Sequence, residues 1–139
     1  MKTPIINAFP PNIAAIRAKF NIAGRGVVFA YGSAIYNPVG KELPQSIIRH
    51  EEVHLREQKG DPEEWWDRYI KDKAFRLEQE LMAHRMEYIT MLQELNFPGR
   101  PARRRLVRFI AKKLASPIYG PMINIDNAKR LLNGNNAIA

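Results

Sequence analysis

The sequence predicts an α+β protein that is mostly helical and carries one small β-hairpin. From residue 44 onwards, apolar residues recur at helical spacing, and short segments rich in Gly and Pro separate the helical stretches. Before them, residues 27–31 read Val-Val-Phe-Ala-Tyr, a run of the β-branched and aromatic types that favour strands. Gly32 and Ser33 then form a tight turn into a short return strand at residues 34–36. The hairpin leads directly into the next helix.

The length of 139 residues is that of one domain with a hydrophobic core. We expect residues 27–96 to form the core of this domain and residues 100–134 a basic helical region. The chain has no Cys, so thiolate metal sites and disulfides are excluded. It also lacks a leader-like N-terminal run and any apolar stretch of about 18 residues. We therefore expect a cytoplasmic protein without a transmembrane segment.

Six helices are expected. The first follows Asn12, a residue that can act as an N-cap, and ends before Gly24. The segment before Asn12 is rich in Pro and is expected to be irregular, and the tail at residues 135–139 is expected to be frayed. The other five helices, bounded mostly by Gly and Pro, are predicted at residues 44–58, 63–70, 72–96, 102–114 and 126–132.

The sequence of residues 50–54 has the form H-E-x-x-H inside a predicted helix. Residues four apart lie on one face of a helix, so His50 and His54 can bind one Zn²⁺ side by side. Glu51 follows the first His and can reach a water at the metal. Only three His occur in the chain, and two of them are at this spacing. The motif therefore predicts a zinc site with Glu51 as general base.

A catalytic zinc site takes three protein ligands, so two His leave one ligand to find. Without Cys, it must be a third His or a carboxylate. The helix predicted at residues 72–96 offers Glu78, Glu80, His84 and Glu87.

A downstream motif limits this choice. Residues 80–84 read Glu-Leu-Met-Ala-His and match E-x-x-A. H-E-x-x-H followed by E-x-x-A on a later helix resembles the gluzincins, which are zinc peptidases with Glu as the third ligand. The resemblance covers roughly residues 27–88. It implies a zincin-like fold, one Zn²⁺ per chain held by His50, His54 and Glu80, and a strand at residues 27–31 that pairs with extended substrate.

His84 stands where the family usually has an Asp that orients a ligand His. It could orient a ligand in the same way, or compete as a ligand itself. The chain is also similar to small phage or bacterial proteins of unassigned role. These share a hairpin, an H-E-x-x-H-x-x-x-Q helix and a C-terminal Tyr-Gly loop, and Gln58 and Tyr119-Gly120 fit that form.

The positions of Glu80 and Glu78 around the predicted helix distinguish them as candidate ligands. At about 100° per residue, Glu80 lies about 40° from His84 and beside the apolar stripe formed by Leu77, Leu81, Tyr88, Leu92 and Leu95. Glu78 lies nearer the middle of that stripe, where it could pair with Arg85, and it is the reserve ligand. One straight helix over residues 63–96 would leave Glu80 about 18 Å too far along to meet His54. We therefore predict a break near residues 71–73.

Positive charge is concentrated in one segment. Residues 100–113 contain seven basic residues and no acid, in a chain whose formal net charge is +8. The candidates for anion binding are Arg103, Arg104, Arg105 and Arg108. The segment is either a solvated helix face or a surface for an anionic partner such as nucleic acid, phospholipid or an acidic protein.

Together these patterns predict a zinc-dependent metallopeptidase acting on a peptide or protein substrate, with Tyr119 as a candidate donor to an oxyanion. The alternatives are a zinc-binding protein without catalysis, and a nucleic-acid-binding module that uses residues 100–113. H-E-x-x-H also occurs by chance in proteins that bind no metal.

Overall fold

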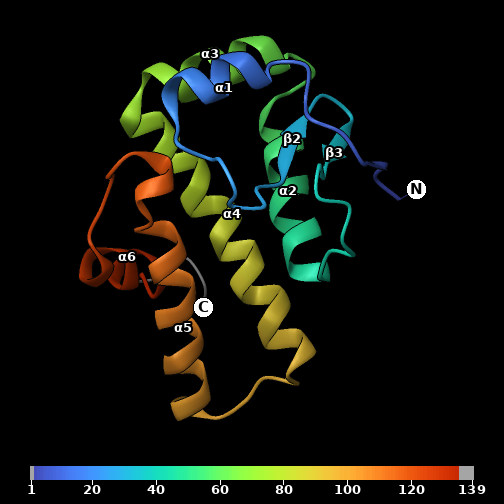
Figure 1. Ribbon diagram of the computed structural model, residues 1–139. Helices are drawn as coiled ribbons and strands as arrows, with labels where there is room; N and C mark the ends of the chain where they lie inside the picture. The colour runs from blue at the N-terminus through green and yellow to red at the C-terminus, as the bar shows by residue number, and fades with distance from the viewer. Residues whose placement is uncertain (1, 135–139) are drawn as a thin grey trace.

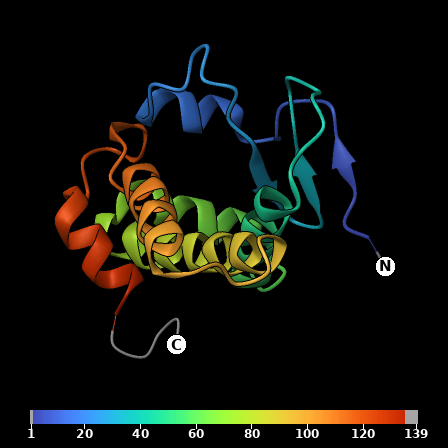
Figure 2. The ribbon, with the colours of Figure 1, turned by 90° about the horizontal axis from the view of Figure 1, so that it is seen from below.

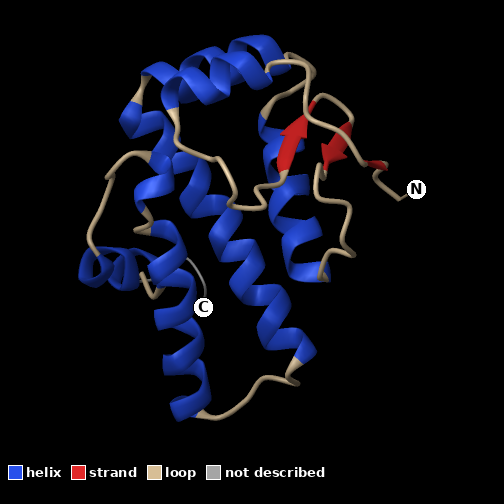
Figure 3. Cartoon of the chain, in the orientation of Figure 1, coloured by secondary structure: helices blue, strands red, loops and turns tan. Residues whose placement is uncertain are grey.

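A computed structural model describes residues 2–134 (Figure 1). Helices predominate and the sheet is small, which confirms the predicted α+β, mostly helical class (Figure 3). The helices of this part of the chain are α1 (Ile13–Lys19), α2 (Gln45–Glu57), α3 (Pro62–Lys71), α4 (Lys73–Glu94), α5 (Arg100–Leu114) and α6 (Ile125–Leu132), with a 3₁₀ turn, η1, at Pro117–Tyr119. Each predicted helix is present with small shifts at its ends. The tail predicted to fray lies outside the described residues.

The sheet has three strands in the order β1–β3–β2. The predicted hairpin is confirmed as β2 (Phe29–Tyr31) antiparallel to β3 (Ala34–Tyr36). The expectation that the N-terminal segment is irregular is wrong for β1 (Ile5–Ile6), which pairs in parallel with β3. Two residues are too few to show strand alternation in the sequence, and the pairing partner of this strand lies about 30 residues away.

The predicted break near residues 71–73 is confirmed: Asp72 separates α3 from α4. Its backbone is extended, with φ −113° and ψ 104°, and its side chain accepts a hydrogen bond from the N–H of Phe75, so it caps α4. The buried guanidinium of Arg76 donates to the carbonyl of Tyr69 at 2.8 Å and fixes the angle of the corner. Asn12 precedes α1 as expected, but its side chain makes no capping bond.

Two clusters of buried apolar residues form the hydrophobic core. One joins α4, α5 and α6 around Leu106, Ile110 and Leu132. The other joins α1, β2 and α3 around Ile16, Trp65 and Trp66. The sheet lies at one end of the molecule and α6 at the other (Figure 2). In residues 2–134, every helix is too short or too polar to cross a lipid bilayer.

Helix α4 departs from the predicted apolar stripe. Leu95 is 55% exposed, and Leu77 and Leu81 are only half-buried. The most buried positions along its first four turns are instead mostly polar: Arg76, Gln79, Glu80, Ala83, His84 and Glu87. Buried polar side chains need partners, and α2 presents them, since α2 and α4 pack closely against each other.

Candidate metal centre

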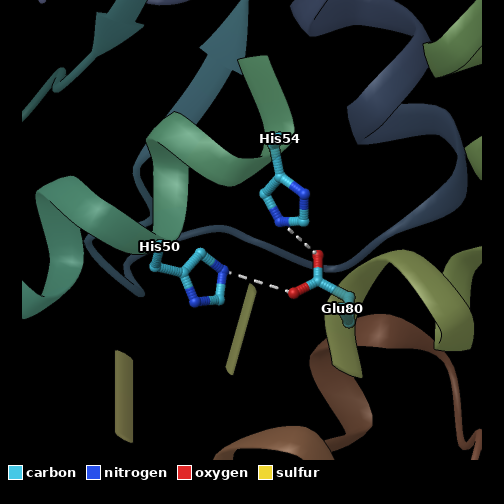
Figure 4. A group of neighbouring side chains, drawn as sticks. All are labelled: His50, His54 and Glu80. Carbon is cyan, nitrogen blue, oxygen red and sulfur yellow. Dashed lines mark ion pairs between the residues drawn. The ribbon is translucent and has the colours of Figure 1, made fainter. Parts of the chain in front are cut away.

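Helices α2 and α4 bring His50, His54 and Glu80 together (Figure 4). The two imidazoles lie one helical turn apart on α2 and face the carboxylate on α4. His50 Nε2 lies 3.3 Å from Glu80 Oε1, and His54 Nε2 lies 3.2 Å from Glu80 Oε2. All three residues are at most 5% exposed, and the candidate ligand atoms lie within 4.8 Å of one another. The group could hold a metal ion.

Buried polar atoms at the centre of this group lack hydrogen-bond partners. Among the described residues, neither His54 Nε2 nor Glu80 Oε1 has one. A buried polar atom without a partner is costly, and native structures rarely leave two of them within one small group. A cation between the three side chains would satisfy both atoms, so the residues present fit a bound metal.

The outer nitrogen of each imidazole is held by a carboxylate. His50 Nδ1 donates to Glu87 at 2.9 Å, and His54 Nδ1 donates to Glu57 at 2.8 Å. A carboxylate accepts only, so Nδ1 of each ring carries a proton and Nε2 is the nitrogen directed toward Glu80. Metal-binding His residues commonly have such a carboxylate behind them, which fixes the tautomer and raises the basicity of the ligand.

The carboxylate of Glu80 is held in a similar way by the hydroxyl of Tyr69, which donates to its Oε2 at 2.6 Å. Burial by itself would raise the pKa of Glu80, but the two neighbouring His hold it well below its usual range. Burial would lower the pKa of His50, yet the carboxylates of Glu80 and Glu87 beside its two ring nitrogens raise it to about 9. The cluster thus favours positive charge at the two Nε2 atoms, where either a proton or a metal can supply it.

His50, His54 and Glu80 are the candidate ligand group, called the ligand group below. Glu51 lies beside this group but is not part of it. Its Oε2 is 3.7 Å from His50 Nε2, and the residue is 7% exposed. Burial raises its pKa to about 7, although the nearby His50 and His54 oppose the shift. At neutral pH this carboxylate can therefore both accept and release a proton.

A second group, formed by His50, His84 and Glu87, also meets the distances for metal binding. Both oxygens of Glu87 are already used, however, one by His50 and the other by the ammonium of Lys113. The group around Glu80 is therefore the better candidate.

His84 is fully buried, and its ring lies edge-on to His50 at 4.6 Å between centroids. Its Nδ1 donates to the carbonyl of Glu80 at 2.7 Å. Burial and the nearby charge of His50 lower its pKa to about 4, so it is neutral. His84 supports the ring of His50 by packing, with a carbonyl rather than a ligand nitrogen as its hydrogen-bond partner.

The expectation for Glu78 is wrong. Its side chain is exposed and belongs to neither metal-binding group. Arg85, its expected partner, donates instead to the carbonyl of Leu131 in α6. The predicted apolar stripe is not the buried face of α4, so Glu78, which lies near that stripe, is on the exposed side of the helix.

A cavity of about 90 Å³ opens beside the ligand group. His50, Glu51 and Glu80 form its polar end. Its other walls are mostly apolar and come from α1, the segment before β2, α3 and η1: Ile16, Phe20, Ile22, Val27, Val28, Phe29, Trp65, Trp66 and Ile118. The two Trp residues therefore belong both to the core and to the wall of the cavity.

Tyr119 also lines this cavity. Burial and the neighbouring carboxylates of Glu80 and Glu51 raise its pKa well above the usual value, so its hydroxyl keeps its proton and can donate. The carbonyl of Ala30 in β2 already accepts from Gln58 and Trp66, each at 2.9 Å, so it is not available to a pairing strand.

Several residues hold the candidate ligands in place, a role that the sequence analysis did not assign to them. Glu57 is three residues after His54, and Glu87 is seven after Glu80, so both lie on faces already known to point inward. Those spacings were a usable signal. Tyr69 and Lys113 come from other helices, and their contacts depend on the tertiary packing. The basic candidates Arg103, Arg104, Arg105 and Arg108 lie elsewhere, on the exposed side of α5.

Comparisons of the chain with protein-family models, with curated proteins and with solved structures find no match.

Proposed function

We propose that this protein is a zinc-dependent peptidase whose ligands are His50, His54 and Glu80. One observation carries the proposal: within residues 2–134, the buried atoms His54 Nε2 and Glu80 Oε1 have no hydrogen-bond partner. Hydrogen bonds meanwhile hold the Nδ1 atoms of both His and the Oε2 atom of Glu80. Two imidazoles and one carboxylate are the ligand set of many catalytic zinc sites. Zinc is favoured over the hard cations Mg²⁺ and Ca²⁺, since imidazole nitrogen suits the softer metal.

Zn²⁺ bound here would polarise the scissile carbonyl and lower the pKa of its water to about 7. The protein's own residues do the rest. Glu51, buried beside the three ligands, accepts a proton from the attacking water at its carboxylate and returns it to the leaving amine. Tyr119 donates its hydroxyl hydrogen to the oxygen on which negative charge develops.

The substrate in this proposal is an extended peptide with an apolar side chain in the cavity beside the ligand group. Full strand pairing along β2 is not supported, because the carbonyl of Ala30 is occupied. Backbone pairing would use residues 27–28, which lie before β2 and line the cavity.

The experiment has two parts: metal analysis of the purified protein, and cleavage of a quenched peptide library. We expect one zinc per chain, lost in His50→Ala. Glu51→Gln should keep the zinc and lose turnover, because it removes only the proton acceptor. Glu52→Gln is the matched control: this neighbouring carboxylate is half-buried, bonds to Thr3 and lies outside the cavity. Turnover in Glu51→Gln would contradict the mechanism.

A metal site without catalysis is the second candidate. It is favoured by the small volume of the cavity, about 90 Å³, and by the near-complete burial of the three ligands. The same experiment separates the two: zinc that is bound and lost with His50, but no cleavage of any library peptide, indicates a structural ion.

A further inference from the structure

A second surface of the protein is a groove formed by α5 with parts of α4 and α6. It has a volume of about 660 Å³. Helices α5 and α6 lie on the side of the molecule away from the sheet (Figure 2). Tyr88, Val107 and Asn133 contribute neutral walls. Six cationic side chains line it: Arg100, Arg103, Arg104, Arg105, Arg108 and Lys129.

These six cations have no acidic partner in the part of the chain that the structure describes. Within residues 2–134, none of them forms an ion pair, whereas Lys71 pairs with Asp67, Arg68 with Asp72 and Lys113 with Glu87. The lack of acids in residues 100–113 means that helix neighbours cannot provide carboxylates either. Positive charge of this density, left without internal partners, attracts polyanions.

The packing of α5 argues against a membrane as the partner. A helix that binds a lipid surface needs a free apolar face to insert. The apolar face of α5 is already buried in the core with α4 and α6, and its members are at most 8% exposed: Leu106, Val107, Ile110, Ala111 and Leu114. Phe109 is the only large apolar side chain of α5 that is exposed. A charged groove with little free apolar surface fits a polyanion that stays in water.

Arginine dominates the groove, and this favours phosphate over carboxylate polymers. A guanidinium binds phosphate through two parallel hydrogen bonds and retains its charge at any physiological pH. Arg104 and Arg108 are four residues apart, so they lie in one row along α5, about 6 Å apart along the axis. The groove is not lined by Phe109 and has only Tyr88 as an aromatic wall, so stacking of successive bases is not supported.

We propose that this groove binds the phosphodiester backbone of a nucleic acid, with little dependence on sequence. Arg103, Arg104 and Arg108 of α5 and Lys129 of α6 hold the phosphates from two sides. Lys113 takes no part, because its ammonium is bound to Glu87 inside the protein. The inference is independent of the zinc site, which lies in a different pocket with different lining residues.

The test is fluorescence anisotropy with labelled duplex DNA, single-stranded DNA and RNA of one sequence over a range of salt concentrations. We expect binding that weakens steeply with salt. A triple variant, Arg103→Gln with Arg104→Gln and Arg108→Gln, should weaken binding at least tenfold and reduce the slope of log K against log salt by roughly three, one for each lost phosphate contact. Comparing duplex DNA, single-stranded DNA and RNA also shows which of these nucleic acids the groove prefers.

A matched triple variant removes the same charge elsewhere: Lys19→Gln, Lys59→Gln and Lys73→Gln, all exposed and outside the groove. It should bind nearly as well as the original protein. Equal weakening by both triples would overturn the groove as the site, since net charge alone would then explain binding. Absence of salt-sensitive binding to any nucleic acid, or tighter binding to polyglutamate or to anionic vesicles, would also overturn it.

Two further controls accompany the test. Circular dichroism checks the fold of each variant. His50→Ala, which changes the other pocket, should bind nucleic acid as the original protein does.

Discussion

At the residue scale, the metal group depends on side chains that a list of ligands omits. His50 is held by Glu87, which is in turn held by Lys113, so three helices support the orientation of one imidazole. Glu87 is 1% exposed, and its pKa is lowered to about 2, because hydrogen bonding and the charge of His50 outweigh its burial. Lys113, one of the seven basic residues of its segment, points inward to this carboxylate.

Replacing Lys113 by Met should therefore weaken zinc binding by roughly tenfold, as loss of a partner behind a ligand commonly does. The reason is that Glu87 would retain a buried oxygen without a donor. Competition with a fluorescent zinc chelator measures the affinity. Lys112→Met is the control, since this neighbour is exposed on the same helix. If both variants bind zinc equally well, Lys113 does not position the site.

The two carboxylates Glu78 and Glu80 give a second test on one helix. Glu80→Gln removes a buried, charged ligand and should reduce zinc affinity by more than about 100-fold, the upper range for residues behind the ligands. Glu78→Gln changes an exposed side chain and should leave the affinity unchanged. Zinc titration followed by calorimetry compares the two. A larger loss in Glu78→Gln would restore it as the ligand.

At the element scale, α2 is fixed at both its face and its end. Its face packs on α4, and its end is joined to the hairpin by Gln58, which is 2% exposed. The side chain of Gln58 donates to the carbonyl of Ala30 and accepts from the N–H of Gly32 at 2.8 Å. The sheet thus holds the helix that carries the two His.

Gln58→Ala should lower stability by about 1–3 kcal/mol, because the half-buried N–H of Gly32 loses its acceptor and the buried side chain of Gln58 is removed. In a chain of this size, that corresponds to a fall in Tm of several degrees. Zinc stoichiometry should remain one per chain if the zinc proposal holds. Thermal unfolding measures the effect, with Gln93→Ala, an exposed Gln on α4, as the control. Equal Tm values for the two variants would show that the link to the hairpin is unimportant.

At the scale of the whole molecule, the buried charges predict how stability depends on pH without metal. Glu87, with its pKa lowered from 4.5 to about 2, stabilises the fold above pH 4.5 and loses this effect as the pH falls. His50, raised from 6.5 to about 9, stabilises it below pH 6.5 and loses this effect as the pH rises through 9. Glu51, raised to about 7, and His84, lowered to about 4, act in opposite directions between these limits. Stability should be greatest between pH 4.5 and 6.5.

Zinc should change the dependence of stability on pH, mainly at alkaline pH. It replaces the proton at the Nε2 atoms, so binding becomes easier as those protons leave. The increase in Tm on adding zinc should therefore be larger at about pH 8 than at about pH 6. Binding at neutral pH should also release protons, which calorimetry in buffers of different ionisation enthalpy detects. An increase in Tm that is independent of pH would contradict the assignment of both His as ligands.

Much of the architecture could be predicted from the sequence because its signals are local. The hairpin and the H-E-x-x-H helix each follow from neighbouring residues. The break at Asp72 was predicted in another way, from the rise of a straight helix that would keep Glu80 away from His54. Strand β1 could not be predicted, because its pairing comes from a distant partner. The buried face of α4 was misjudged for a related reason: apolar periodicity identifies a dry interface, and here α2 meets α4 through His and Glu side chains.

The length of α4 has a consequence for how the two proposed surfaces relate. Glu80 belongs to the metal group and Tyr88 to the charged groove, and both lie on this one unbroken helix. Eight residues separate them, about 12 Å along the axis. A nucleic acid held in the groove would thus remain at a constant offset from the zinc ligands and outside their cavity. The cavity and the groove share no lining residue, so a nucleic acid in the groove would leave the cavity open to a peptide.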